Sequence, residues 1–536
     1  MYRRLRSLLK NIAMPASNTE GVKAANPVHS QATSTPTESS PYNYTTEGKA
    51  TILTPKKDEV FYNPIQQFNR DISTLSIIAY DQLRAEQNEL KNKSKNKKRK
   101  LLGLTILEAL SASGLRSCRY GLEIPNVYKI VANDLSPDAV ASINRNIEHN
   151  QLIGKVVANQ DDAIKFMAST TNKFNIVDLD PYGTASPFLD SAIQCIEEDG
   201  MLLVTCTDAA VLAGSGYPEK CFALYGGNNF GNSYINSETN HEVGIRLMLQ
   251  SVAATAAKYK KSIEPMLSLS IDYYFRVWVK VKTSPIRVKN LASETMLTFG
   301  CNGCGHKIAQ PLGIRNDNKY VYPKLVGQVS SHCQFCGSTF NVAGPMFVGP
   351  LHNQKFINKI LQLNENCDKQ TYKTSERIKG MLTLTQSELD SVPFFYNLNH
   401  LSSMFKSPPI SIDEYSKAVG NMGYKLSLTH AKKIVLRAYV EEMKSKFESE
   451  GSLNEKITEK LTKLEQDITY SPNLNEKSVG AQILNYLKKQ ELATDVAVDF
   501  DTSNEESDKI SKLRKVKMVR YQENPTKNWG PMARPK

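Results

Sequence analysis

The chain has 536 residues, which is more than one ordinary domain and predicts two or three. Apolar residues make up 40% of it, enough for sizeable cores, but no uninterrupted apolar stretch has the length of a membrane span, so we expect no stable membrane insertion. The net charge of +13 favours a polyanionic partner, either nucleic acid or an acidic membrane surface.

Residues 1–47 are expected to be disordered and to lie outside the fold. Four basic residues fall within the first ten, and no acid precedes Glu20. This pattern is typical of a mitochondrial presequence, although a merely basic disordered tail has the same composition. Initiation at Met14 would produce a chain without the basic segment, so we predict that the molecules divide between nucleus and mitochondrion.

A helix with one buried face is predicted from Phe68 to Leu83, because apolar residues recur there at spacings of three and four. Residues 91–100 follow, with seven basic residues in ten and no acid. We interpret this run as a solvated loop, with RNA contact as the alternative.

Strands and helices then alternate. Short apolar runs predict strands at 104–110, 127–132, 156–160, 175–179 and 201–205, with helices at 136–149 and 238–260 and two final strands within 267–282. This rhythm indicates an α/β fold with a mostly parallel sheet and helices on both faces. We therefore expect one Rossmann-like domain over residues 48–288.

Two acids follow successive predicted strands. Asp134 lies about twenty residues after Gly114, where such folds place an acid on a ribose hydroxyl, and Asp162 follows the next strand. Either could cap a helix instead, but their joint placement favours a nucleotide-type ligand. Only Gly114 matches the glycine-rich fingerprint, and Ser111 and Ser113 hinder close approach of a pyrophosphate. S-adenosylmethionine has no phosphate, so we predict a class I methyltransferase rather than a dehydrogenase.

The strand at 175–179 ends abruptly at Asp180, Pro181, Tyr182 and Gly183. A carboxylate and a backbone carbonyl together can accept both hydrogens of an exocyclic amine and return electron density to its nitrogen, while an aromatic ring stacks on the extruded base. Ligands bind at this end of the strands in open α/β sheets. The alternative is structural: Asp180 would cap a helix that has Pro181 in its first turn.

Four of the nine cysteines are paired in the sequence, as Cys301 with Cys304 and Cys333 with Cys336. Two such knuckles can supply four thiolates to one Zn²⁺ in a closed, structural site. His306 and His332 are reserve ligands, and disulfides are the alternative. The 28 residues between the pairs predict a two-strand excursion within a zinc-binding region at 289–350.

The rest of the chain is expected to form a mostly helical domain at 351–494 and a tail at 495–536. Residues 411–436 have the spacing of a small helix-turn-helix-like bundle, for RNA docking or for passive packing. The tail is acidic first and basic later, with aromatic residues interleaved, which suits either RNA contact or pairing with its own acidic run.

Several stretches together closely resemble the eukaryotic form of the tRNA (guanine-26) N2-dimethyltransferase family. The resemblance covers about residues 49–350, with a weaker echo at 520–531. The stretches that carry it are Phe61-Tyr62-Asn63-Pro64, Asn69-Arg70-Asp71, Ala112-Ser113-Gly114-Leu115-Arg116, Asn133-Asp134, Asp180-Pro181-Tyr182-Gly183 and the cysteine pairs.

The resemblance implies methyl transfer from S-adenosylmethionine to the exocyclic N2 of guanine 26 in tRNA. It implies that Asp180 and the Pro181 carbonyl orient the amine and that Phe61 and Tyr182 sandwich the flipped base. The residues that it implies for the donor are Arg70 and Arg116 at the carboxylate, Asp134 at the ribose, and Asp162 and Ala163 at the adenine.

Overall fold

The protein is described from a computed structural model that covers residues 41–56, 62–95, 101–214, 216–231, 234–317, 319–325, 329–390, 392–406, 410–429, 435–438, 475–489 and 499–517. The predicted presequence, Met14, Phe61 and the basic part of the tail from residue 518 onward lie outside these residues. The chain divides into two units, Met1–Pro41 and Tyr42–Lys536, and the second is described here.

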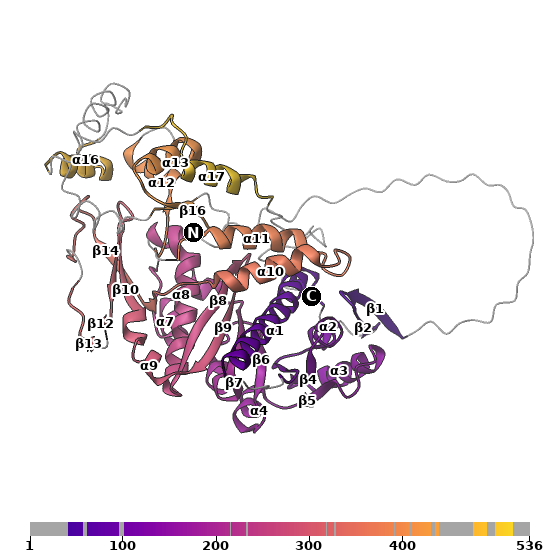
Figure 1. Cartoon of the computed structure of the whole chain (residues 1–536). Helices are drawn as coiled ribbons and strands as arrows, with labels where there is room; N and C mark the ends of the chain where they lie inside the picture. The colour runs from indigo at the N-terminus through magenta and orange to yellow at the C-terminus, as the bar shows by residue number, and fades with distance from the viewer. Residues whose placement is uncertain are drawn as a thin grey trace, which may run out of the picture. The chain divides into compact units, whose positions relative to one another are not determined.

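A seven-stranded sheet forms the centre of the region predicted as one Rossmann-like domain (Figure 1). Its strand order is β5-β4-β3-β6-β7-β9-β8, and all neighbours are parallel except those involving β9. The strands are β3 (Leu104–Glu108), β4 (Val127–Asp134), β5 (Val156–Gln160), β6 (Phe174–Leu179), β7 (Ile196–Cys206), β8 (Lys261–Ile271) and β9 (Tyr274–Thr283). The expected mostly parallel α/β sheet is therefore confirmed.

Helices cover both faces of this sheet because the apolar strand residues alternate between them. In β7, Leu202 and Val204 belong to one buried cluster, and Met201 and Leu203 belong to the other. The helices are η1 (Pro64–Gln66), α1 (Gln67–Lys95), α2 (Leu115–Glu123), α3 (Pro137–His149), α4 (Ala163–Ser169), η2 (Ser186–Phe188), α5 (Leu189–Cys195), α6 (Ala209–Leu212), α7 (Pro218–Tyr225), α8 (Tyr234–Lys258), α9 (Pro285–Val288) and η3 (Leu291–Glu294).

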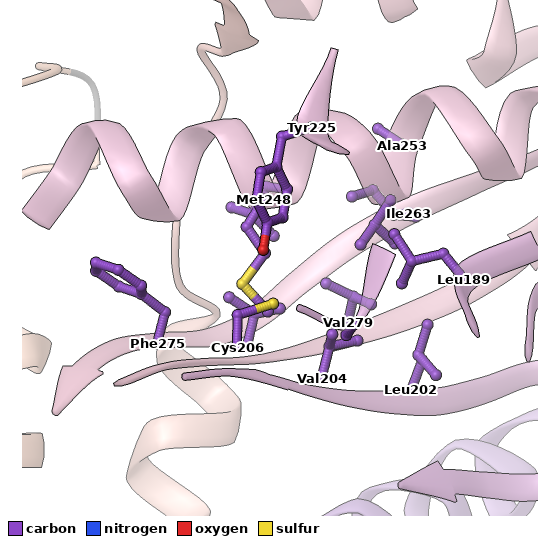
Figure 2. Close-up of a cluster of buried hydrophobic side chains, with 14 of the residues drawn as sticks. Leu189, Leu202, Val204, Cys206, Tyr225, Met248, Ala253, Ile263, Phe275 and Val279 are labelled. Atoms are coloured by element: carbon purple, nitrogen blue, oxygen red, sulfur yellow. The ribbon is translucent and has the colours of Figure 1, made fainter. Parts of the chain in front are cut away.

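Figure 2 shows the cluster between α8 and the sheet. Met248 of α8 lies over Cys206 of β7, and the hydroxyl of Tyr225 points toward their two sulfur atoms. None of these three side chains is more than 3% exposed. Such close packing holds the carboxyl end of β7 in place, next to the loop that follows β6.

The fold begins earlier than the sequence predicts. Residues 42–47 form β1 (Tyr42–Glu47), which pairs antiparallel with β2 (Ala50–Pro55). The expected boundary at residue 47 was wrong because β1 has no local apolar pattern: it pairs with β2, and Glu47, which is only 2% exposed, pairs with Arg70 and Arg119.

A three-stranded sheet carries the four paired cysteines. It has the order β11-β10-β14, from β10 (Thr295–Cys301), β11 (Lys307–Pro311) and β14 (Phe340–Phe347). Between the cysteine pairs, β12 (Ile314–Asn316) and β13 (Lys319–Val321) form the expected two-strand excursion. The cysteines lie in the turns at the ends of β10 and β14.

The first C-terminal helices extend the main core. Buried residues of α10 (Gln354–Asn366) and α11 (Ser375–Ser387) belong to the same cluster as α1 and the sheet. The later elements are α12 (Leu398–Phe405), α13 (Ile412–Asn421), α16 (Val479–Lys489) and a small sheet of β15 (Tyr396–Asn397), β17 (Val435–Ala438) and β16 (Leu426–Leu428).

The predicted helix-turn-helix-like bundle at 411–436 was wrong in its second half. α13 forms as expected and begins with a capping box at Ser411, but Leu428 and Val435 lie in strands β16 and β17. β17 pairs with β16 on one side and with β15, some forty residues upstream, on the other, so sheet pairing overrode a local helical spacing.

Two further expectations need correction. The basic run was expected to be a loop, but Lys91–Lys95 continue α1, since lysine is a good helix former. In the expected tail, α17 (Glu505–Lys515) packs against α13, and its Ile510 is fully buried. Among the described residues, no helix is both long and apolar enough to cross a membrane.

Candidate active site

The turn after β3 meets the end of β4 through backbone groups. Gly114 has a positive φ of 74°, and a Cβ there would lie 3.2 Å from the side chain of Ile143 in α3, so glycine suits this close approach. The Asp134 carboxylate accepts hydrogen bonds from the backbone N–H of Ala112 (2.8 Å) and of Ser136 (3.0 Å). Asp134 therefore lies beside the turn, as predicted, and helps to shape it.

Asp180 lies in the loop after β6, and no helix begins there. Its Oδ2 accepts hydrogen bonds from the Nδ2 of Asn69 (3.2 Å) and from the Nη2 of Arg116. The capping alternative for Asp180 and Pro181 is not realised, since the next helix, η2, begins at Ser186. The side chain of Asp180 is 22% exposed, so a fixed carboxylate faces a solvent-accessible space.

A buried network of charges supports this loop. Asp178, two residues earlier in β6, pairs with Arg276 of β9 (2.9 Å) and with Arg116 (3.5 Å), and accepts a hydrogen bond from the hydroxyl of Tyr120 (2.6 Å). Burial alone would raise the pKa of Asp178, but the two guanidinium groups outweigh it and hold the pKa below its usual value. Asp178 is thus the ionised centre of the network.

Arg116 is surrounded by carboxylates. Besides Asp178 and Asp180, it lies 3.5 Å from Glu108 at the end of β3. Burial alone would lower the pKa of Arg116, yet the nearby negative charges of Asp178 and Asp180 raise it well above its usual value. Burial raises the pKa of Glu108 to about 7, against the opposing effect of Arg116. The guanidinium group is therefore positioned by three acids, including the predicted catalytic one.

Arg70, the other predicted donor residue, is held by Glu47. Its Nε lies 2.6 Å from one carboxylate oxygen, and its Nη2 pairs with the other. Glu47 also pairs with Arg119 of α2 (2.8 Å), which pairs in turn with Asp71 (2.7 Å). Asp71 accepts a hydrogen bond from the Thr374 hydroxyl (2.7 Å), so this second network joins β1, α1, α2 and α11.

Tyr182 is prominently placed on the same loop. Tyr182 is 78% exposed, and its partial burial together with the charges of Asp180 and Asp134 raises its pKa. Gly183 is fixed to the end of β7 by hydrogen bonds between its backbone and Thr207 (2.7 and 2.8 Å). An exposed ring therefore stands on a firmly anchored loop.

At the end of β5, Asp162 caps α4. Its Oδ1 accepts a hydrogen bond from the backbone N–H of Lys165 (3.0 Å), so the capping alternative is realised here. A capping carboxylate keeps further lone pairs, and a contact with an adenine is compatible with the cap. Ala163 is 7% exposed and begins the helix.

The four paired cysteines converge in space. Their sulfur atoms all lie within 4.8 Å of one another, with Cys301 to Cys336 at 3.4 Å and Cys304 to Cys333 at 3.7 Å. These separations exclude disulfides, whose sulfurs are about 2.05 Å apart. They are close to the edge of about 3.8 Å that follows from Zn–S bonds of about 2.3 Å in a tetrahedron. The cluster fits one Zn²⁺ with four thiolate ligands.

Among the predicted active-site residues, the structure shows direct contact between Arg116 and Asp180, and it adds residues that sequence patterns missed. Asp134 lies at the end of β4, Arg70 pairs with Glu47, and Asp162 caps α4. Glu47, Asp178 and Arg276 were not predicted, because their oppositely charged partners are 23 to 98 residues away and no local spacing marks them.

Comparisons with known proteins agree with this geometry. A sequence model of a family described as "N2,N2-dimethylguanosine tRNA methyltransferase" matches residues 42–446. The chain is 45% identical to the mitochondrial tRNA (guanine(26)-N(2))-dimethyltransferase of Saccharomyces cerevisiae, with 92% of each chain covered. It is 32% identical to the human tRNA (guanine(26)-N(2))-dimethyltransferase, over 91% of this chain and 77% of the human one.

A solved structure of Trm1 from Pyrococcus horikoshii with S-adenosyl-L-methionine is similar to this fold, with a TM-score of 0.60 and 27% identity. It covers 74% of this chain and 97% of its own. The family match, the close relatives and the shared architecture lead to one conclusion: the chain belongs to the N2,N2-dimethylguanosine tRNA methyltransferase family.

Proposed function

We propose that this protein transfers methyl groups from S-adenosylmethionine to the exocyclic N2 of guanine 26 in tRNA, giving mono- and dimethylguanosine. The observation that carries the proposal is the fixed Asp180 carboxylate in the loop at the end of β6, in a chain whose relatives are named for this reaction. The donor supplies an activated methyl group, and this chain supplies binding and orientation.

Asp180 acts on the amine. Arg116 and Asn69 both bind its Oδ2, and among the described residues its Oδ1 has no hydrogen-bond partner. Oδ1 is therefore the oxygen that accepts one amine hydrogen, while the carbonyl of Pro181 accepts the other. Both contacts raise the electron density on the nitrogen, which forms the new N–C bond as the S–C bond to the methyl group breaks. S-adenosylhomocysteine leaves, and one proton is released from the nitrogen to solvent for each methyl group gained.

Tyr182 stacks on the extruded guanine. Its exposure and its anchored loop support this role, because an exposed ring on a rigid support loses little conformational freedom when a base binds. Phe61 is proposed as the opposite side of the sandwich, from the sequence resemblance alone.

The donor is held by Arg70, Arg116, Asp134, Asp162 and Ala163. Each oxygen of Asp134 already accepts one backbone N–H and keeps a lone pair for a ribose hydroxyl. The resemblance supports Arg70 and Arg116 at the donor's carboxylate, whose two oxygens suit a forked guanidinium group. The observed contact of Arg116 with Asp180 adds a second role, which is to orient the catalytic carboxylate.

Zinc is proposed as a structural ion at the four cysteines. Four thiolates leave no coordination position for water, so no catalytic step is assigned to it. We also propose mitochondrial targeting, which the basic N-terminus and the mitochondrial relative support, and a nuclear form that starts at Met14.

The test is direct. The purified full-length chain is incubated with S-adenosylmethionine and a tRNA transcript, which is then digested to nucleosides and analysed by mass spectrometry. We expect N2-methylguanosine followed by N2,N2-dimethylguanosine, and neither product from a transcript with adenine at position 26. A methylated adenine, or no modified nucleoside, would overturn the proposal.

A further inference from the structure

The β12–β13 hairpin and the adjoining α9–η3 segment share one surface at the end of the sheet opposite Asp180. The hydroxyl of Tyr320 in β13 donates a hydrogen bond to the Oδ1 of Asn290 (2.9 Å), which ties the hairpin to this segment. β9 runs antiparallel to β7, with Phe275 opposite Cys206, so its other end, Thr283, lies about 26 Å farther along the sheet.

This surface is strongly basic. Over residues 282–325 the chain has seven basic and two acidic residues, and six of the basic ones are exposed. Among the described residues, none of these six forms an ion pair within 4 Å. They are Lys282, Arg287, Lys289, Arg315, Lys319 and Lys324.

Aromatic side chains lie among these cations. Tyr322 is 92% exposed and Tyr320 is 39% exposed, and Leu325 beside them is 73% exposed. Both tyrosines line a hollow of about 370 Å³ whose rim includes Lys289. Exposed aromatic rings leave apolar surface in contact with water. A planar partner that stacks on them removes this surface from water, which is favourable.

We propose that this surface, defined by Lys289, Arg315, Lys319, Tyr320, Tyr322 and Lys324, binds a second part of the same tRNA. The proposal rests on the proposed function. Cations without an ion-pair partner can contact phosphates, and exposed rings can stack on unpaired bases. Proteins use this combination to bind single-stranded regions of RNA. A tRNA is long enough to contact this surface while one of its bases lies at Asp180, so the surface contributes affinity and orientation without touching the reacting atoms.

Charge favours RNA over a protein partner. The core of a protein–protein interface is depleted in lysine and other charged residues. By contrast, four of the six residues that define this surface are positively charged. Binding to RNA must therefore depend steeply on salt, because each phosphate contact releases counterions.

The experiment compares two matched pairs of substitutions in the full-length chain. The test variant combines Tyr322→Ala with Lys324→Gln. The control combines Tyr128→Ala with Lys129→Gln, an exposed Tyr-Lys pair on β4 at the far side of the sheet. Equilibrium binding of a full-length tRNA transcript is measured from about 50 to 200 mM salt, with melting temperature and S-adenosylmethionine binding as checks of folding.

We expect the test variant to bind tRNA about tenfold more weakly, with the slope of log affinity against log salt reduced by about 1. Its KM for tRNA rises, and its kcat at saturating tRNA stays at the wild-type value. The control keeps wild-type affinity. A fourfold variant, with Lys289, Arg315, Lys319 and Lys324 each changed to Gln, reduces the slope by about 3.

Wild-type affinity and salt slope in the folded fourfold variant would overturn this inference and assign the surface to another partner. That outcome is distinct from failure of the proposed function, which is a wild-type enzyme that does not methylate guanine 26. An equal loss of affinity in the Tyr128 and Lys129 control would also overturn it, because general charge would then account for the effect.

Discussion

The charge network beneath Asp180 and the four-cysteine cluster are both buried and polar, but they are stabilised differently. In the network, Arg116 and Arg276 surround Asp178, so each charge meets an opposite charge from the same chain. The cysteine cluster brings four like groups together, and the proposed zinc ion would neutralise their thiolates. The first site can form by folding alone, whereas the proposed zinc would couple folding of the second to metal binding.

The largest effect is expected at the cysteine cluster. Replacing Cys301 with Ser removes one of four ligands, and structural zinc sites contribute on the order of 10 kcal/mol to the folding of small metal-binding domains. We expect loss of bound zinc and a clear fall in melting temperature, while kcat per folded molecule persists. Loss of kcat with zinc content and melting temperature unchanged would contradict a structural role.

At Asp180 we expect the opposite result, a loss of activity with little loss of stability. Asp180→Ala should reduce kcat by about 10²–10⁴-fold, because the amine loses its charged acceptor, while the melting temperature and donor binding stay close to those of the wild type. The measurement is a single-turnover rate on tRNA together with calorimetric titration of S-adenosylmethionine. Asp199→Ala, which changes an acid far from the site, is the control and should keep full activity.

A substitution at Asp178 tests whether the buried charges of the network stabilise one another. Asp178→Asn leaves Arg116 and Arg276 facing each other without their shared counter-charge, which should lower the free energy of unfolding by about 3–5 kcal/mol. Asp413→Asn breaks an exposed pair with Arg514 and should cost less than about 1 kcal/mol. Denaturant titration measures the free energy of unfolding of both variants. Equal small losses would show that the buried network does not stabilise the end of the sheet that carries Asp180.

Substitution of Glu108 should give the smallest effect, which is a change in how the free energy of unfolding depends on pH. Its pKa is raised to about 7 in the fold against 4.5 for the ordinary group, so between these values the folded protein binds more protons than the unfolded chain. Its contribution to stability is therefore present below about pH 4.5 and is lost as the pH rises toward 7. The loss is at most about 3 kcal/mol. Glu108→Gln should remove this dependence of stability on pH. An unchanged dependence would refute the assignment of the raised pKa to Glu108.

Sequence patterns predicted well wherever the information was local. Apolar periodicity located the strands and helices of the main sheet, since a strand or helix must alternate at its own period to bury one face. The cysteine pairs predicted their cluster for a similar reason, because each knuckle holds two ligands on one short turn. Predictions failed at β1, β16 and α17, whose own apolar patterns are weak: Glu47 of β1 pairs with Arg119, β16 pairs with β17, and α17 is buried through Ile510.

The sequence by itself determined the α/β class, the family, the acids at the strand ends and the four clustered thiols, since each depends on the order of residues over a few turns of chain. Only the tertiary structure decided which charges meet. It placed Arg116 against Asp180, Glu47 against Arg70 and Arg276 against Asp178. The physical reason is that a buried charge requires an opposite charge within a few ångströms, and folding can supply it from any position in the chain.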